Sequence, residues 1–373
     1  MGFLIYISLI VSGLLFQKSK LISALICIFM WIVFAYGTNS SDSGNYQYVY
    51  ENILNSSLQK HYEPGFSILM MFSNKVGLTF LQFRMLLASI YVLIIYKSIN
   101  NYSKYASLVL ALFIIAPFFF FVSGLRNAIS SAIIIYSIKY LYKDNRKAKI
   151  KYLIGLLFAT MFHYSSVFYI VFLLINKNKK MNLLKSRRGL FILMLMVFSA
   201  VIVQLPEIAH YLIQLVTNNT KILYWFSNQI TTTSIFGALL FSFIFILSVI
   251  YSTVSKNTML NFSKSNNAYT LENASFSITV NQIFYYLIIW MPFMMINVTY
   301  LRLLMGVFPL LLCSYINSSK ITIDNSNINQ VKFKSTEFGF IIYVIFLGIF
   351  NGFIYYSGSG FSYLDLLAIF NFN

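Results

Sequence analysis

The sequence has few charged side chains and almost no cysteine. Of its 373 residues only 10% are charged and 59% are hydrophobic, whereas about a quarter of a soluble globular chain is charged. This scarcity excludes water as the main solvent of the chain. The two cysteines, Cys27 and Cys313, both fall in apolar runs, where a thiol is an ordinary packing group. The sequence therefore indicates no disulfide framework and no metal site.

Three further features are missing. The apolar runs do not alternate with polar residues as the strands of a membrane barrel do. The segment 2–16 lacks a basic stretch and a small-residue cleavage site, so we expect a retained first helix and not a signal peptide. No internal repeat is present, which argues against a carrier built from two related halves.

What the sequence does contain is a series of apolar runs of about 16 to 24 residues, long enough to cross the roughly 30 Å hydrocarbon core as helices. Inside lipid each backbone amide must be satisfied within its own segment, which favours helices. The pattern predicts an all-α polytopic membrane protein, with residues 1–373 forming a single integral membrane domain of about ten transmembrane helices. The runs lie at 2–16, 21–36, 80–97, 105–122, 127–142, 189–205, 234–252, 280–298, 301–316 and 339–356, with further apolar stretches at 64–78 and 152–175.

Basic residues set the predicted orientation. The formal net charge is +18, and most Lys and Arg residues fall in short loops that the positive-inside rule places in the cytoplasm. This distribution explains the charge without a nucleic-acid partner. It leaves outer loops near 37–63 and 206–233, so polar chemistry on the outer side is expected mainly from these loops.

The segment 152–175 conflicts with a simple crossing, because Lys and Arg residues flank it on both sides. Two half-helices meeting near His163 would keep both flanks in the cytoplasm. This re-entrant hairpin would place a histidine at membrane depth, where non-helical backbone needs cover from protein or from a water-filled cavity. A lone histidine in an apolar helix is more often a packing residue, but the near-neutral pKa typical of histidine also suits proton transfer.

A few basic residues fall outside the predicted cytoplasmic set: Lys60, Lys75, Arg84, Arg126, Lys221 and Arg302. An arginine in the membrane is expensive, so it usually faces a cavity, a partner or a ligand. Arg126 and Arg302 each lie in a tight connection at the predicted outer boundary, where each could snorkel to the interface or pair with a carboxylate. Two together favour a phosphate or pyrophosphate site, because the guanidinium fork matches phosphate oxygens and a helix starting near Asn127 would add its positive end.

The first outer loop combines carboxylates with aromatic rings. It contains Asp42, Tyr46, Tyr50 and Glu63. Either this is a solvated loop with tyrosines at the membrane interface, or it is a glycan-binding surface in which carboxylates accept hydroxyl protons and rings pack on sugars. From these residues alone the solvated loop is favoured.

In their order and spacing these motifs resemble the EpsG-type family of membrane polysaccharide polymerases, relatives of the Wzy O-antigen and capsule polymerases. The resemblance is good over about residues 36–175 and general beyond them. This family has Arg-Gln where the chain has Arg126-Asn127, so an amide is kept with a shorter reach. The resemblance rests on the stretch 42–50, on Glu63-Pro64-Gly65-Phe66, on Gly124-Leu125-Arg126-Asn127 and on Phe162-His163-Tyr164-Ser165-Ser166, with Arg302 as a late arginine.

The resemblance implies a metal-independent membrane glycosyltransferase of GT-C-like architecture without a cofactor. It would polymerise undecaprenyl-pyrophosphate-linked oligosaccharides at the outer face of a bacterial inner or plasma membrane, alongside a flippase and a chain-length regulator. Arginines would stabilise the leaving pyrophosphate. The roles expected on this basis are pyrophosphate binding for Arg126, Arg302 and Asn127, base or acceptor contacts for Asp42, then His163, then Glu63, and glycan contacts for Tyr46, Tyr50 and Arg84.

Other functions stay open at this stage. A flippase for lipid-linked oligosaccharides would also need a cationic cavity, but with about twelve or more crossings and repeat symmetry. A membrane O-acyltransferase would be of similar length, but such families place a catalytic histidine and arginines in or near the first helices, whereas here the first are His61 and Arg84. A structural membrane subunit would give no reason for arginines on the outer side.

Overall fold

The computed structural model describes residues 2–39, 41–59, 61–143, 146–175, 232–263, 268–290, 301–325, 337–349 and 369. Every regular element in these ranges is a helix, as the sequence predicts. The predicted run 189–205 and nearly all of the predicted outer loop 206–233 lie outside the described residues. The GT-C-like architecture stays a prediction.

Three helices among the described residues are long and apolar enough to cross a membrane: Phe80–Tyr102, Ser242–Ser263 and Leu301–Lys320. These helices agree with a polytopic membrane protein, while the full count of about ten crossings stays a prediction. The shorter apolar helices are Gly2–Leu15, Lys20–Tyr36, Ala106–Ile115, Tyr164–Leu174 and Glu337–Ile349.

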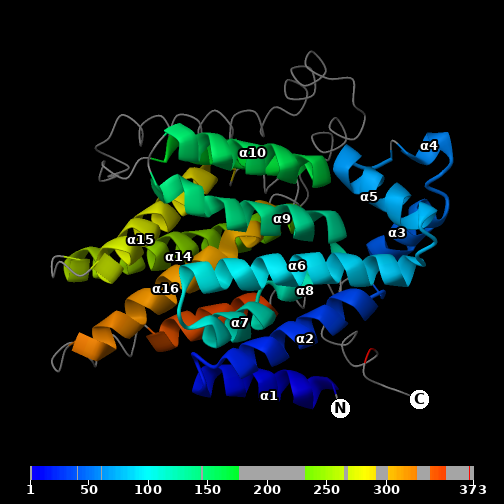
Figure 1. Cartoon of the computed structure of the whole chain (residues 1–373). Coiled ribbons are helices and arrows are strands. Elements are labelled where there is room, and N and C mark those ends of the chain that lie inside the picture. Colours follow the sequence, from blue (N-terminus) through cyan, green and yellow to red (C-terminus); the bar gives the residue numbers. More distant parts are fainter. Residues whose placement is uncertain are drawn as a thin grey trace. The chain divides into compact units, whose positions relative to one another are not determined.

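The chain divides into two compact units, and the first comprises Met1–Ile170 with Gly306–Asn373. In this unit α2 packs on α6 and α7, α6 packs on α9, and α9 packs on α10, so that these helices run side by side (Figure 1). The labelled helices of its N-terminal part are α1 (Gly2–Leu15), α2 (Lys20–Tyr36), α3 (Ser41–Glu51), α4 (Ser56–Gln59), α5 (Pro64–Lys75), α6 (Phe80–Tyr102), α7 (Ala106–Ile115), α8 (Phe118–Ser123), α9 (Leu125–Ser137) and α10 (Arg146–Phe162), with the 3-10 helices η1 (Ile138–Lys143) and η2 (Tyr164–Leu174).

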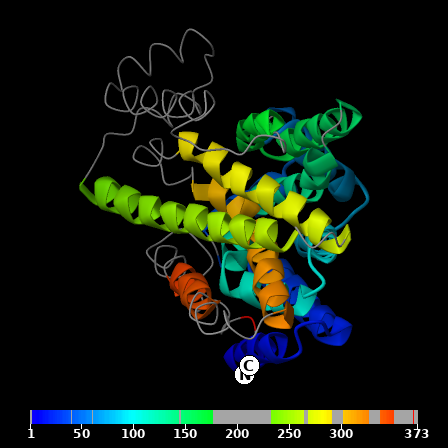
Figure 2. The same ribbon diagram turned by 90° about the vertical axis from the view of Figure 1, so that its left-hand side faces the viewer.

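The second unit, Val171–Met305, contains α14 (Thr232–Ser263) packed on α15 (Ala268–Leu287), seen together in Figure 2. The amide of Asn281 on α15 donates to the hydroxyls of Ser252 and Thr253 on α14 at 3.1 and 2.9 Å. Interhelical hydrogen bonds of this kind join helices in surroundings where apolar surface gives little driving force. The boundary with the first unit falls inside α16 (Leu301–Asn325).

Short helices gather at one end of the first unit. α3, α4 and α5 lie beside the end of α6 from which that helix begins (Figure 1), with α3 packed on α5 and α6. α5 also packs on α10. The segment predicted as an outer loop over 37–63 is therefore partly helical, and its residues are held against the ends of the long helices.

The prediction of one helix over 105–122 is wrong. α7 ends at Ile115, and α8 begins at Phe118. Pro117 explains the interruption, because proline has no N–H to donate and disfavours helical backbone at the residue before it. The helix predicted over 127–142 is also divided: α9 ends at Ser137, and the 3-10 helix η1 follows it directly.

Arg84 is buried in the core of the first unit. It lies in the second turn of α6 with 0% of its surface exposed. Its guanidinium donates to the carbonyl oxygens of Phe34, Ala35 and Gly37 at 2.7, 2.9 and 2.7 Å. Carbonyls at a helix C-terminus have no partner within the helix and carry the negative end of its dipole. Arg84 thus caps α2. This contact explains why one basic residue lies outside the loops that the positive-inside rule places in the cytoplasm.

Replacing Arg84 by Met should destabilise the protein. Methionine keeps an unbranched apolar stem, but the carbonyls at the end of α2 lose their donor, and each buried hydrogen bond to a charged group contributes about 1.5–3 kcal/mol. The purified variant should unfold at a lower temperature in detergent and give less monodisperse protein by size exclusion. Arg146→Met, at an exposed position at the start of α10, is the matched control. Equal thermal stability of the two variants would show that the cap contributes little.

Candidate functional site

A buried carboxylate organises the end of the first unit at which α3 and α5 lie. Glu63 Oε2 accepts a hydrogen bond from Arg126 Nη1 at 2.5 Å. Glu63 Oε1 lies 3.1 Å from His163 Nδ1. The side chains of Glu63 and His163 are 4% and 6% exposed, while that of Arg126 is 24% exposed. We call these three residues, together with Tyr46 and Tyr62, the Glu63 cluster.

The sequence Glu63-Pro64-Gly65-Phe66 explains how the carboxylate reaches its partners. Pro64 is the first residue of α5, where its fixed φ suits a helix start. Glu63 is the N-cap residue, with an extended backbone and no side-chain capping bond, so its carboxylate serves other helices. A Cβ atom at Gly65 would lie 2.9 Å from both Cβ and the carbonyl oxygen of Met161 on α10. Only glycine therefore allows α5 to approach α10 this closely.

Arg126 enters the cluster from the first turn of α9. Its Nε donates to the Tyr46 hydroxyl at 3.2 Å. Its guanidinium carbon lies 4.5 Å from the centre of the Tyr62 ring and 5.8 Å from that of Tyr46. Cation–π contacts at this range are favourable, and more so when desolvated. The arginine is thus fixed by a carboxylate, a hydroxyl and two rings, yet it is the most exposed charged member of the cluster.

His163 occupies the break between two helical segments. α10 ends at Phe162 and η2 begins at Tyr164, whose backbone N–H donates to Glu63 Oε1 at 3.3 Å. The two segments meet again farther on, because the Tyr152 hydroxyl donates to the Tyr169 carbonyl at 2.9 Å. The sequence placed the break at this position, and the re-entrant topology of 152–175 stays a prediction.

Electrostatics keep Glu63 ionised. Burial by itself would raise the pKa of the carboxyl, but the hydrogen bond from His163 and the charge of Arg126 outweigh it and lower the pKa from 4.5 to about 2. For Tyr62, burial raises the pKa of the hydroxyl, and the neighbouring Tyr46 and the carboxylate of Asp42 add to the effect. The cluster therefore holds a carboxylate and a guanidinium, both charged, beside an imidazole.

Two other predicted site residues lie beside the cluster. Asp42 is half-buried in the first turn of α3, one helical turn before Tyr46. Asn127 follows Arg126 and is 5% exposed. Its Oδ1 accepts a long hydrogen bond of 3.5 Å from Ser131, and its Nδ2 has no hydrogen-bond partner among the described residues. A buried donor without a partner is uncommon in proteins and is a candidate for ligand contact.

The structure does not bring the remaining predicted residues into the cluster. Tyr50 is 1% exposed, stacks on Phe83 and donates to the Leu78 carbonyl at 2.7 Å. Arg84 caps α2, as described above. Arg302 begins α16 in the second unit, so its predicted pairing with Arg126 stays a prediction. Within the described ranges, no group of three or more His, Cys, Asp or Glu residues could hold a metal ion.

Sequence reasoning missed Tyr62 and Gly65. Tyr62 stacks under the guanidinium and packs edge-on against Phe66, with ring centres 5.7 Å apart. Its position next to Glu63 was the available signal, but an interfacial tyrosine gives the same pattern. Gly65 was visible as part of a motif, whereas its contact with α10 depends on a residue nearly a hundred positions away.

Comparison with known families identifies one match. The model of the EpsG family matches residues 20–365, which include the whole Glu63 cluster. This confirms the resemblance predicted from the motif order. No curated protein and no solved structure matches the chain.

The stabilisation from Glu63 should depend on pH. Because the pKa of this carboxyl is lowered in the folded state, its contribution is fully present above about pH 4.5 and is lost as the pH falls toward 2. A lowering from 4.5 to about 2 corresponds to roughly 3 kcal/mol. Thermal unfolding in detergent should therefore show a smaller loss of stability between pH 6 and pH 3 for Glu63→Gln than for wild type. Glu51→Gln removes an exposed carboxylate of α3 and should follow wild type; equal pH dependence of all three proteins would contradict the assignment.

Proposed function

The chain belongs to the EpsG family of membrane polysaccharide polymerases in exopolysaccharide biosynthesis, and from this premise we propose that it joins oligosaccharide repeat units carried on undecaprenyl pyrophosphate. The reaction takes place at the outer face of the bacterial plasma membrane. The observation that supports this proposal is the geometry of the Glu63 cluster. A partly exposed arginine at the start of a helix adjoins a buried carboxylate–imidazole pair there. The product is an O-antigen, capsule or exopolysaccharide chain.

The proposed transfer requires one proton acceptor and one site for a leaving anion. The terminal hydroxyl oxygen of one repeat unit attacks the anomeric carbon of the growing chain, forming the new glycosidic C–O bond. The C–O bond to pyrophosphate breaks, and undecaprenyl pyrophosphate leaves with the electron pair. The hydroxyl proton passes to His163 and then to water. A general base in such a position typically contributes about 10²–10⁴-fold.

We assign the base role to His163, ahead of Asp42. Glu63 engages Nδ1 of the imidazole, which fixes the ring, and in this proposal the other ring nitrogen, Nε2, takes the proton. The carboxylate also stabilises the imidazolium that forms. Glu63 itself is a positioning residue, because its low pKa makes it a weak base and both its oxygens are engaged with protein groups. Asp42 is then an acceptor contact at the edge of the cluster.

Charge in the cluster changes during the transfer in the direction that the reaction needs. Before proton transfer, the charges of Arg126 and Glu63 balance. When His163 takes the hydroxyl proton, the cluster gains a positive charge at the moment at which negative charge grows on the departing pyrophosphate. Only interactions that strengthen in the transition state accelerate a reaction. Asn127, with its unpartnered Nδ2, and Arg302 supply further donors to the pyrophosphate in this proposal.

Aromatic rings border the cluster and would meet the sugar only at their edges, because Tyr62 is 8% exposed, Tyr46 4% and Phe66 0%. Tyr46, Tyr62 and Phe66 pack against one another, with ring centres 5.3 to 5.9 Å apart. His61 packs edge-on against Tyr62 at 4.7 Å. Ring edges and a neighbouring carboxylate can together contact the C–H and hydroxyl groups of a sugar. Tyr46 thus has two roles in the proposal: it holds Arg126 and borders the glycan.

Substituting Arg126 should stop polymerisation, and the loss per molecule of protein should exceed any fall in protein level that results from leaving the buried carboxylate of Glu63 without its partner. In a strain that lacks the gene, Arg126→Ala and Arg126→Lys should leave single repeat units that are exported and attached but not extended, with the transfer rate lowered by about 10²–10³-fold. Lysine should not restore polymerisation, because a single ammonium group cannot contact both Glu63 and Tyr46 as the branched guanidinium does. Arg146→Ala should restore long chains. The readout is gel separation of lipid-linked and surface glycans, with membrane protein quantified by immunoblot.

The same assay separates the proposal from its alternatives. Repeat units stranded on the cytoplasmic side would indicate a flippase, and chains of normal length with altered acetylation would indicate an O-acyltransferase. Long chains made at the wild-type level by Arg126→Ala would refute the role of this arginine.

His163 and Asp42 can be distinguished by rate. With purified enzyme and a lipid-linked repeat unit, His163→Gln should slow transfer by about 10²–10⁴-fold, whereas Asp42→Asn should lose less than about tenfold. The acid limb of the kcat/KM profile should disappear from the residual activity of His163→Gln and persist in Asp42→Asn. The reverse order of effects would assign the base to Asp42.

A further inference from the structure

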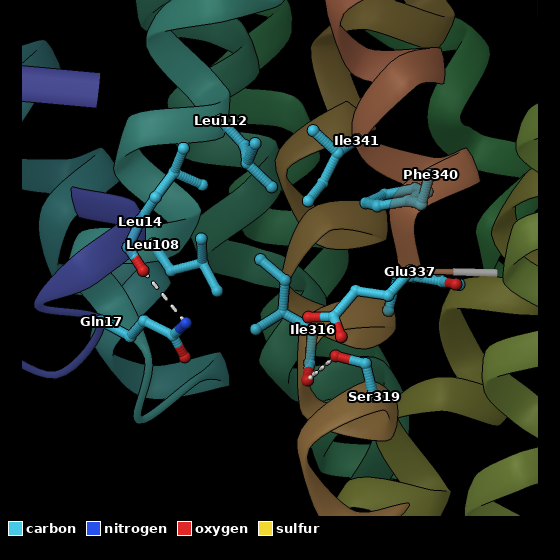
Figure 3. A pocket seen from close by; sticks show the side chains of 10 residues that line it. Leu14, Gln17, Leu108, Leu112, Ile316, Ser319, Glu337, Phe340 and Ile341 are labelled. Carbon is cyan, nitrogen blue, oxygen red and sulfur yellow. Dashed lines mark hydrogen bonds between the residues drawn. The ribbon is translucent and has the colours of Figure 1, made fainter. Parts of the chain in front are cut away.

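A cavity of about 260 Å³ lies in the first unit (Figure 3). Its apolar walls come from four helices: Leu14 lies on α1, Leu108 and Leu112 on α7, Ile316 on α16, and Ile341 on the helix Glu337–Ile349. Gln17, Ser319 and Glu337 are its polar lining residues. Figure 3 shows Leu112 and Ile341 toward one side of the cavity and Gln17 and Ser319 toward the other. The cavity is therefore amphipathic, with a long apolar part and a polar mouth.

Three lysines lie close in the sequence to residues that line the cavity, although the only charged group among the described lining residues is the carboxylate of Glu337. Lys18 follows Gln17, Lys320 follows Ser319, and Lys104 precedes the turn of α7 that bears Leu108. The ammonium groups of Lys18 and Lys104 lie 4.9 and 5.4 Å from the centre of the same ring, Tyr105. Lys320 forms an ion pair with Glu337 at 2.9 Å. Among these described residues, Lys320 is paired with Glu337, while Lys18 and Lys104 add two positive charges near the same ring.

Hydrogen bonds hold the three lysine-bearing segments together. The Ser107 hydroxyl of α7 donates to the carbonyl of Phe16 at 2.5 Å. Asn317 of α16 donates to the Tyr102 carbonyl at 2.7 Å and accepts from Ser103 at 2.7 Å. The turn before α2, the connection from α6 to α7 and the last turns of α16 are thus tied into one structure. The lysines are brought together by the fold and not only by a common side of the membrane.

The mouth and the Glu63 cluster lie at opposite ends of the same helices. Arg84, in the second turn of α6, contacts the end of α2, whereas Lys18 and Lys104 lie at the start of α2 and the end of α6. The positive-inside rule places the lysine end in the cytoplasm. The surface of the cytoplasmic leaflet has a negative potential, and this potential attracts lysine side chains that lie close to it.

We propose that this cavity binds one acyl chain of an anionic glycerophospholipid of the cytoplasmic leaflet, with the lipid phosphate between Lys18, Lys104 and Lys320. A cavity below the roughly 300–1,000 Å³ of small-molecule sites suits one linear chain. The acyl chain gains little by leaving the other lipids, because both surroundings are apolar, so selectivity comes from the head group. The site would therefore distinguish phosphatidylglycerol from phosphatidylcholine and is independent of the glycan reaction.

Native mass spectrometry of protein released from lipid nanodiscs tests the proposal. The nanodiscs contain phosphatidylcholine with phosphatidylglycerol as a minor component. Wild type should retain phosphatidylglycerol at about tenfold or more above its share of the bilayer. The double variant Lys18→Gln/Lys104→Gln should lose this enrichment. Leu112→Trp, which fills the apolar part of the cavity, should lose the retained lipid itself.

The control is the double variant Lys97→Gln/Lys139→Gln. These lysines lie at the same end of the unit, over the ring of Tyr136 at 5.7 and 3.3 Å, but do not adjoin the cavity. The control should keep wild-type enrichment. A loss of enrichment equal to that of Lys18→Gln/Lys104→Gln would mean that general charge attracts the lipid and would overturn the site. Equal retention of both lipids by wild type would overturn it too, even if Leu112→Trp proved unstable.

Discussion

The ion pair between Glu63 and Arg126 holds together the end of the first unit at which α3 and α5 lie. Both groups are removed from most of the solvent, and each charge is tolerated because the other lies beside it. The pair also sets the geometry: Glu63 begins α5, Arg126 begins α9, and the second carboxylate oxygen reaches His163 at the break after α10. Three helix ends are thereby fixed at one point, and loss of one partner would leave the other charge buried and uncompensated.

Arg84 and Arg126 differ in the protein groups that compensate their positive charge, and therefore in the role of each side chain. Both are arginines near the same end of the unit, where a charge in an apolar environment is costly. Arg84 is wholly enclosed and donates to the carbonyls that end α2, so its charge serves the fold. Arg126 keeps 24% of its side chain exposed and is paired with an acid that also contacts an imidazole. An arginine held in this way can still meet an anion, and this is the physical basis of the proposed polymerase chemistry.

The two ends of the first unit differ in the charged groups that they carry. At one end a guanidinium, a carboxylate and aromatic rings suit a glycan and a pyrophosphate. At the other end lysines surround an apolar cavity that suits a bilayer lipid. α2 and α6 run between these ends, and their apolar residues match the hydrocarbon core.

The sequence by itself determined the membrane class, the position of most helices and the family, because the length of an apolar run, the sign of nearby charges and the order of short motifs are local properties. It also located the break at His163. The pairing of Glu63 with Arg126, and the enclosure of Tyr50 and Arg84 in the core, are visible only in the folded chain. The reason is physical: Glu63 meets partners 63 and 100 positions away, and a pairing over that separation depends on how closely α5 and α10 pack at Gly65, which no local pattern encodes.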